Sequence, residues 1–230
     1  MSEPRLILNI GAGKLYSREI ESANGQDCVI YLDRSYDGVT ILEAEERVFD
    51  WLKGKTCNPI FVPADIFEFL DTFKFRFDSI IAYRIFEHME YCSGEIGRLL
   101  EACNMLTNEN ATLDIIVPNA LLLCNMLREY ENLGSDDFAE LKKMELIINS
   151  EFCNIKADPH ASVWTPTLAR MYILSEGTWD IHNIFNPFPF ENRDIYMRIL
   201  CFKGTKEDEW LPLDKIPPVF KDTFTEEKEG

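Results

Sequence analysis

The feature that most constrains the fold is a short apolar run that breaks into two glycines near the N-terminus. Residues 6–13 read Leu-Ile-Leu-Asn-Ile-Gly-Ala-Gly. This pattern is typical of a buried strand that ends in a turn where the backbone can lie close to a ligand. A second apolar run, Cys28–Leu32, ends in Asp33, twenty residues after Gly13. A carboxylate at the tip of a second parallel strand receives ribose hydroxyls in nucleotide-binding sheets. Together the motifs predict a site for an adenosine-containing ligand, whereas the glycines alone also fit a plain turn after a core strand.

The residues after the glycines distinguish between classes of ligand. A dinucleotide-binding turn has a third small residue, which lets a helix pack closely and point its N-terminus at a pyrophosphate. Here that position is Tyr16, within the wider turn of residues 14–17. Such a turn suits an adenosine ligand without phosphate, and S-adenosylmethionine is such a ligand.

Five motifs, in order, resemble those of class I S-adenosylmethionine-dependent methyltransferases over roughly residues 5–202. Residues 8–13 resemble the cofactor loop, with Asn9 where most members carry an acid, and residues 29–33 resemble the ribose-binding strand. The remaining motifs are residues 62–66 (Val-Pro-Ala-Asp-Ile), similar to the third strand with its adenine-binding end; residues 77–88, similar to the fourth strand with its Glu-His ending; and residues 113–119, similar to a fifth strand that reads Val-Pro-Asp in one subgroup.

This resemblance implies an α/β fold with a seven-stranded, mostly parallel Rossmann-like sheet, helices on both faces and a helical insertion after the fifth strand. The methyltransferase domain is expected to span residues 1–203, with the insertion at residues 119–164 and an acidic tail at residues 204–230. The implied cofactor is S-adenosyl-L-methionine. The residues expected to bind it are Asn9, Gly11, Ala12, Gly13, Asp33, Arg34, Asp65, Ile66, Tyr83 and His88.

The hydrophobic pattern independently alternates strands with helices, as in a parallel sheet covered by helices. One helix is well marked, with Thr165 as N-cap, Pro166 at its first position and Gly177 as its stop. The predicted strands are Leu6–Ile10, Cys28–Leu32, Ile60–Val62, residues 79–82 and residues 113–117, with a terminal hairpin of Trp179–Phe185 and residues 195–202. Two further helices are predicted at residues 41–51 and 95–106.

The segment between the fifth strand and Thr165 is longer than a minimal fold of this kind requires. Residues 121–133 and 138–148 have helical patterns separated by Gly-Ser-Asp-Asp. An insertion here lies at the carboxyl ends of the strands, where open sheets bind ligands. We expect a substrate lid, and the alternative is a helical hairpin that extends the core, since both helices are apolar.

Three residues are candidates for the chemistry. Methyl transfer to a protonated acceptor needs a base, and His160, in a polar loop after the fifth strand, is the candidate. Its alternative role is local, bonding Asp158 or capping the next helix. Tyr83 and Arg84, at the end of the fourth strand, are expected to face substrate, and Arg84 suits a carboxylate or phosphate on a small molecule.

A metal site is the competing interpretation of Glu87, His88 and His160. Some methyltransferases hold a divalent ion with Glu-x-x-Glu-His at this strand end and a distant His. Here Arg84 replaces the first Glu, which removes one ligand and repels a cation. The sequence therefore predicts no metal, with Glu87 and His88 lining the cofactor site or holding the strand end; His182, among apolar neighbours, is expected to be structural.

Composition restricts the partners. The chain has 23 Lys and Arg against 40 Asp and Glu, a formal net charge of -17, and its cations form no stripe, which disfavours nucleic acid as a substrate. The 7 cysteines show no Cys-x-x-Cys pairing and indicate reduced thiols. No membrane span or leader pattern is evident, so we expect a cytoplasmic protein without a membrane partner.

Together these features predict a methyltransferase that transfers the methyl group directly to a small-molecule, metabolite or carbohydrate-like substrate. A catalytically inactive binding protein of the same fold is the alternative from another class, supported by the departures at Asn9, Leu15 and Arg84. An enzyme acting on RNA ends or other nucleic acid is a lesser alternative because of the charge. Oligomeric state and acceptor identity leave no signature in the sequence.

Overall fold

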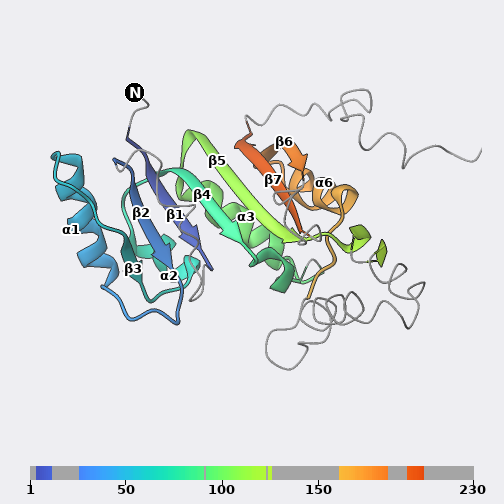
Figure 1. The fold of residues 1–230 in the computed structure, drawn as a ribbon, viewed down its shortest axis with the longest axis horizontal. Coiled ribbons are helices and arrows are strands. Elements are labelled where there is room, and N and C mark those ends of the chain that lie inside the picture. The colour runs from blue at the N-terminus through green and yellow to red at the C-terminus, as the bar shows by residue number, and fades with distance from the viewer. Residues whose placement is uncertain are drawn as a thin grey trace, which may run out of the picture.

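A computed structural model describes residues 4–11, 26–90, 92–122, 124–125, 161–185 and 196–204. Figure 1 shows one sheet with helices packed beside it. The strands are β1 (Leu6–Ile10), β2 (Cys28–Leu32), β3 (Ile60–Val62), β4 (Phe77–Tyr83), β5 (Thr107–Pro118), β6 (Trp179–Phe185) and β7 (Tyr196–Lys203). The described helices are α1 (Ile41–Leu52), α2 (Ile66–Thr72), α3 (Glu95–Met105) and α6 (Pro166–Ser175), with a short 3-10 turn, η2 (Phe86–His88).

The strands form a seven-stranded sheet in the order β3-β2-β1-β4-β5-β7-β6. Strands β1 to β5 are parallel, and β7 runs antiparallel to both β5 and β6. This confirms the predicted α/β fold class and its mostly parallel Rossmann-like sheet. Every predicted strand is present, with β4 and β5 longer than expected; the loop of the terminal hairpin lies outside the described residues.

Helix capping explains two predicted helices and one that the sequence analysis missed. Thr40 and Glu43 form a capping box at the start of α1, and Thr165 caps α6 with Pro166 at the first position. The missed helix is α2, which is only seven residues long. Its start was nevertheless signalled by Asp65 followed three residues later by Glu68.

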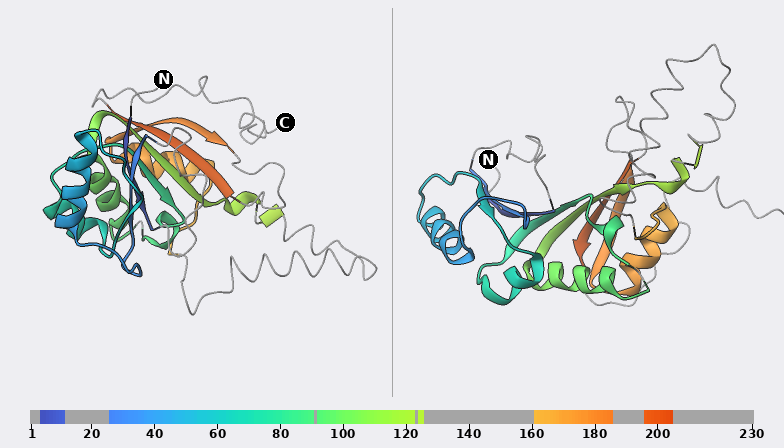
Figure 2. Two further views of the ribbon diagram at one scale, coloured as in Figure 1. Left: turned by 60° about the vertical axis from the view of Figure 1, so that its left-hand side comes forward. Right: turned by 90° about the horizontal axis from the view of Figure 1, so that it is seen from below.

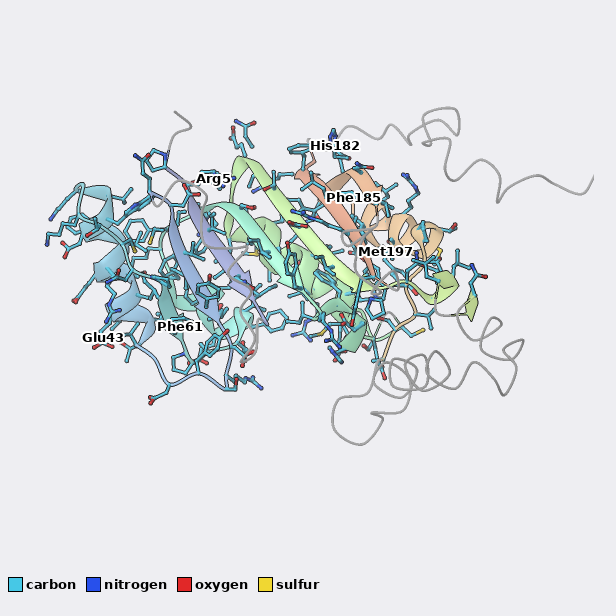
Figure 3. The ribbon with its side chains drawn as sticks, viewed as in Figure 1. Arg5, Glu43, Phe61, His182, Phe185 and Met197 are labelled. Atoms are coloured by element: carbon cyan, nitrogen blue, oxygen red, sulfur yellow. The ribbon has the colours of Figure 1, made fainter. Side chains whose placement is uncertain are left out.

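The core lies mainly on one face of the sheet. Alternate residues of β1, β2, β4, β5 and β7 join buried residues of all four described α-helices in one cluster that extends as far as Met197 (Figure 3). Figure 2 shows α2, α3 and α6 on the same side of the sheet, with α1 beside its β3 edge. On the other face a smaller cluster contains Ile7, Val29 and Tyr31, packed against residues that include Phe61 and Tyr83. The described helices thus cover one face, and aromatic residues pack on the other.

The strand order reverses direction between β1 and β4. From β1 the chain proceeds outward through β2 to β3, whereas β4 and β5 lie on the other side of β1. In open α/β sheets ligands bind outside the carboxyl ends of the strands at such a reversal. The ends of β1 and β4 therefore mark the place to examine for a site. No described helix is long and apolar enough to cross a membrane.

Candidate functional site

The ends of β1 and β4 touch directly at Gly11. This residue has φ +68°, and a Cβ here would lie 2.9 Å from Cδ1 of Ile85. Both the left-handed backbone and the close approach require glycine. Gly11 also donates its N–H to the carbonyl of Leu32 at 3.0 Å, which ties the end of β1 to the end of β2.

Asn9 is the most unusual polar residue of this region. It lies on β1 between Tyr31 of β2 and Ile81 of β4, and it is fully buried. Neither Nδ2 nor Oδ1 has a hydrogen-bond partner among the described residues. A buried amide without partners costs about 1–3 kcal/mol. This side chain, two residues from Gly11, is therefore suited to bond a polar ligand at the end of the strand.

Asp33 follows β2 at the same edge. Its Oδ1 accepts hydrogen bonds from the Ser35 backbone N–H at 2.8 Å and from the Ser35 hydroxyl at 2.6 Å. Its own N–H donates to the carbonyl of Val62 at 3.2 Å, so the end of β2 is fixed to β3 as well. The carboxylate is half-buried and held in a defined turn at the place that the sequence analysis assigned to ribose binding.

Arg34 and Asp65 form an ion pair that links the ends of β2 and β3. The other carboxylate oxygen of Asp65 accepts the backbone N–H groups of Phe67 and Glu68, at 2.8 and 2.9 Å. These backbone donors, chiefly that of Glu68, and Arg34 hold the pKa of Asp65 below its usual range. Ile66 is buried in the larger core cluster. The structure thus places Arg34 and Asp65 together and gives Asp65 a capping role that the sequence analysis did not foresee.

Arg84 directly follows β4 and has a strained conformation. Its φ is 57°, which is uncommon for a residue other than glycine, and such strain is often found at functional sites. Its N–H donates to the carbonyl of Ile116 at 2.8 Å. The side chain is 52% exposed, with Cζ 5.5 Å from the ring centroid of Tyr196 and Nε 4.0 Å from the Glu87 carboxylate. The guanidinium is therefore oriented by neighbours but accessible.

Tyr83 belongs to a polar network that sequence reasoning missed. Its hydroxyl donates to Asp114 at 3.2 Å, and the Arg198 guanidinium bonds both oxygens of the same carboxylate. Asp114 is buried, on β5, and Arg198 lies on β7. The available signal was a charged residue within an otherwise apolar central strand. This network fixes the Tyr83 ring beside the end of β4.

Glu87 and His88 lie in η2, directly after the strand end. The Glu87 side chain is 1% exposed, and its Oε1 lies 3.9 Å from His88 Nε2. Across the part of the chain that the structure describes, no three His, Cys, Asp or Glu residues gather closely enough to hold a metal ion. His182 lies on β6, with its ring centroid 5.0 Å from that of Phe202. It lies near the end of the sheet at which β1 begins, where Arg5 is, and so away from this site (Figure 3).

The chain that leaves β5 returns to the same strand end. The Ala120 N–H donates to the Trp164 carbonyl at 2.8 Å. The two ends of the segment between β5 and α6 are therefore in contact. On its return, the N–H groups of Ala161 and Ser162 donate to the Glu87 carbonyl at 2.8 and 3.0 Å. The base of the insertion is thus attached to η2, next to Arg84.

Three candidate residues lie outside the described residues: Ala12, Gly13 and His160. Ala161, which follows His160 in the sequence, is one of the two residues whose backbone N–H groups donate to Glu87. Most of the insertion, including the two helical patterns predicted within it, also lies outside the described residues.

No protein-family model and no curated protein matches this sequence. The architecture is similar to that of several solved structures. The plantazolicin methyltransferase BpumL, in complex with a triazolic desmethylPZN analog and SAH, is 16% identical with a TM-score of 0.53, over 88% of this chain and 78% of that chain. The pyocyanin biosynthetic protein PhzM is 15% identical with a TM-score of 0.50, over 87% of this chain and 50% of that one.

A third similar structure is magnesium protoporphyrin IX methyltransferase from Synechocystis PCC 6803 with bound SAH. It is 14% identical with a TM-score of 0.50, over 87% of this chain and 75% of that chain. This chain therefore spans half the length of PhzM and about three quarters of the other two. The likeness establishes the fold: the chain has the fold of class I S-adenosylmethionine-dependent methyltransferases.

Proposed function

We propose that this chain is an S-adenosylmethionine-dependent methyltransferase acting on a small-molecule, metabolite or carbohydrate-like substrate. The observation that carries the proposal is the buried amide of Asn9, which lacks a protein partner among the described residues and lies beside Gly11 at the reversal of strand order. The similar structures support the choice of cofactor, since two of them contain SAH, the demethylated product.

The residues at this edge fit such a cofactor. Asn9 would bond its polar amino-acid end, the Gly11 backbone allows it to approach β1 closely, and Asp33 would accept the ribose hydroxyls. The ion pair of Arg34 with Asp65 would close the site at the ends of β2 and β3. When bound, the cofactor supplies an electrophilic methyl group on a sulfonium, and the protein must orient an acceptor toward it.

A small acidic substrate is favoured by the surroundings of Arg84. Its exposed guanidinium can pair with a carboxylate or phosphate, and its stacking on Tyr196 limits its orientations. The net charge of -17 opposes a large polyanion such as nucleic acid. The insertion, attached at both ends beside β4 and β5, would cover the substrate as a lid, with His160 as the base that accepts the acceptor's proton.

Titration calorimetry with S-adenosylmethionine and S-adenosylhomocysteine tests the cofactor assignment. We expect both to bind, and Arg84→Gln to leave their affinities within about twofold because Arg84 is assigned to the substrate. If neither binds, the proposed function is wrong.

A screen of carboxylate- and phosphate-bearing metabolites with radiolabelled methyl donor then tests for turnover. Methylated product that is lost in Arg84→Gln but kept in the exposed control Arg98→Gln supports the substrate assignment. Cofactor binding without turnover on any member of the screen would instead favour the inactive binding protein.

A further inference from the structure

Two cysteines far apart in the sequence meet beside β2. Cys28 is the first residue of β2, and Cys57 lies in the segment between α1 and β3. Their Sγ atoms are 2.7 Å apart, although 29 residues separate them in the chain. A disulfide bond is about 2.05 Å long, so the two sulfurs need to move together by only about 0.7 Å to form one.

We propose that Cys28 and Cys57 are an oxidisable pair that forms an intramolecular disulfide by exchange with a low-molecular-weight disulfide such as oxidised glutathione. The pair lies at the amino end of β2, away from Asp33 at its carboxyl end. The inference therefore does not depend on the proposed function.

The two thiols are unequal in a way that assigns their roles. Cys28 is fully buried, whereas Cys57 is partly exposed. The hydrogen bond from Cys28 lowers the pKa of Cys57, and the positive charge of Arg47 adds to this effect against partial burial. The same contact and burial raise the pKa of Cys28. Cys57 is therefore the accessible, more readily ionised thiol that reacts first.

The exchange proceeds in two balanced steps. The Cys57 thiolate attacks one sulfur of oxidised glutathione, forming a mixed disulfide and releasing one glutathione thiolate. Cys28 then attacks Cys57 Sγ, and its proton goes to the second glutathione thiolate as that group leaves. Two protein thiols are oxidised to one disulfide, and one oxidised glutathione is reduced to two thiols.

The other described cysteines provide the comparison. Cys103 and Cys201 are fully buried, and burial raises the pKa of both thiols, which makes them unreactive. Cys92 and Cys124 are exposed and can therefore take up glutathione. The sulfur–sulfur contact that the structure gives among the described residues is that of Cys28 with Cys57. Among the cysteines that the structure describes, only the pair of Cys28 and Cys57 combines exposure with a second sulfur within reach.

Peptide mapping tests the proposal directly. The native protein is incubated with oxidised glutathione, free thiols are blocked with N-ethylmaleimide, and trypsin is added. Cleavage after Arg18, Arg34, Lys55 and Lys74 leaves Cys28 in peptide 19–34 and Cys57 in peptide 56–74. We expect these two peptides to be recovered joined, and to separate after dithiothreitol.

Two variants and a melting curve complete the test. Cys57→Ala should abolish the joined peptide, whereas Cys92→Ala, at an exposed cysteine, should retain it. Closing a loop of this length should raise the Tm of the oxidised wild type by about 5–15 °C, with no rise in Cys57→Ala. Recovery of Cys57 as a stable glutathione adduct, or as the blocked thiol under conditions that modify Cys92, would overturn the proposal.

Discussion

Replacing Asn9 by leucine is expected to raise the stability of the free protein while it weakens cofactor binding. The two effects have one cause: in the free protein the buried amide has no partner among the described residues, whereas in the complex it would bond the ligand. Leucine has a similar branched shape and no polar atoms. Replacement of an unsatisfied polar group by an apolar group of the same shape removes its desolvation cost.

The magnitude follows from the burial of this side chain. A fully buried, unsatisfied amide costs about 1–3 kcal/mol, and about 1 kcal/mol corresponds to 2–4 °C in Tm for a domain of this size. Asn9→Leu should therefore raise Tm by about 2–12 °C. The hydrogen bonds lost with a charged ligand group are worth about 1.5–3 kcal/mol, so affinity for S-adenosylmethionine should fall at least about tenfold.

The assay pairs thermal unfolding without ligand with titration calorimetry. Ser79→Ala is the matched control, because Ser79 lies on the neighbouring strand β4 and its hydroxyl is satisfied by Thr112 at 2.8 Å. This control should lower Tm, the opposite sign to Asn9→Leu. A lower Tm for Asn9→Leu, or unchanged affinity for S-adenosylmethionine, would show that the Asn9 amide does not hydrogen-bond the cofactor.

The other residues of the site can be tested in the same way. Asp33→Asn should weaken S-adenosylmethionine binding at least about tenfold through loss of a charge-assisted acceptor, measured against Asp37→Asn in the same loop, which should bind normally. His160→Ala should lower turnover about a hundredfold or more with cofactor affinity intact; a drop in Tm with normal turnover per folded molecule would assign it a structural role instead. Activity should survive EDTA, because Arg84 occupies the place of a further carboxylate ligand; loss on chelation with recovery on adding Mg²⁺ would contradict this. The lowered pKa of Asp65 means that its contribution to stability is complete above the usual value of 3.8 and is lost as pH falls through the lower folded value. In melting curves from neutral to acid pH, Asp65→Asn should therefore be less stable than wild type at neutral pH, with a difference that shrinks below about pH 3.8; a constant difference would argue against that role.

Much of the fold could be predicted from local patterns. The central parallel strands are short, nearly continuous apolar runs because both of their faces are covered, and β1 and β2 are present at the predicted bounds. Thr165 and Pro166 identified the start of α6 because capping and the fixed φ of proline act within one turn. The seven-residue α2 was missed because so short a helix has too few turns to show a period.

The candidate site was only partly accessible to sequence reasoning. Gly11 and Asp33 could be predicted because each follows directly from the place where a strand ends. The partner of Asp65 could not, because it depends on how the ends of β2 and β3 are aligned. Ala12, Gly13 and His160 remain predictions.

Local patterns predicted the strands, the Thr165-capped helix α6 and the glycine that follows β1, since these depend on steric and hydrogen-bond preferences within a few residues. Which distant side chains meet depends instead on how the strands are ordered and aligned. Asp114 and Arg198 are brought together by the antiparallel pairing of β5 with β7, and Cys28 and Cys57 by the segment that enters β3. Strand order and register set these contacts, and both are decided by the packing of the whole sheet. The same packing buries Asn9 completely, and its amide has no protein partner among the described residues.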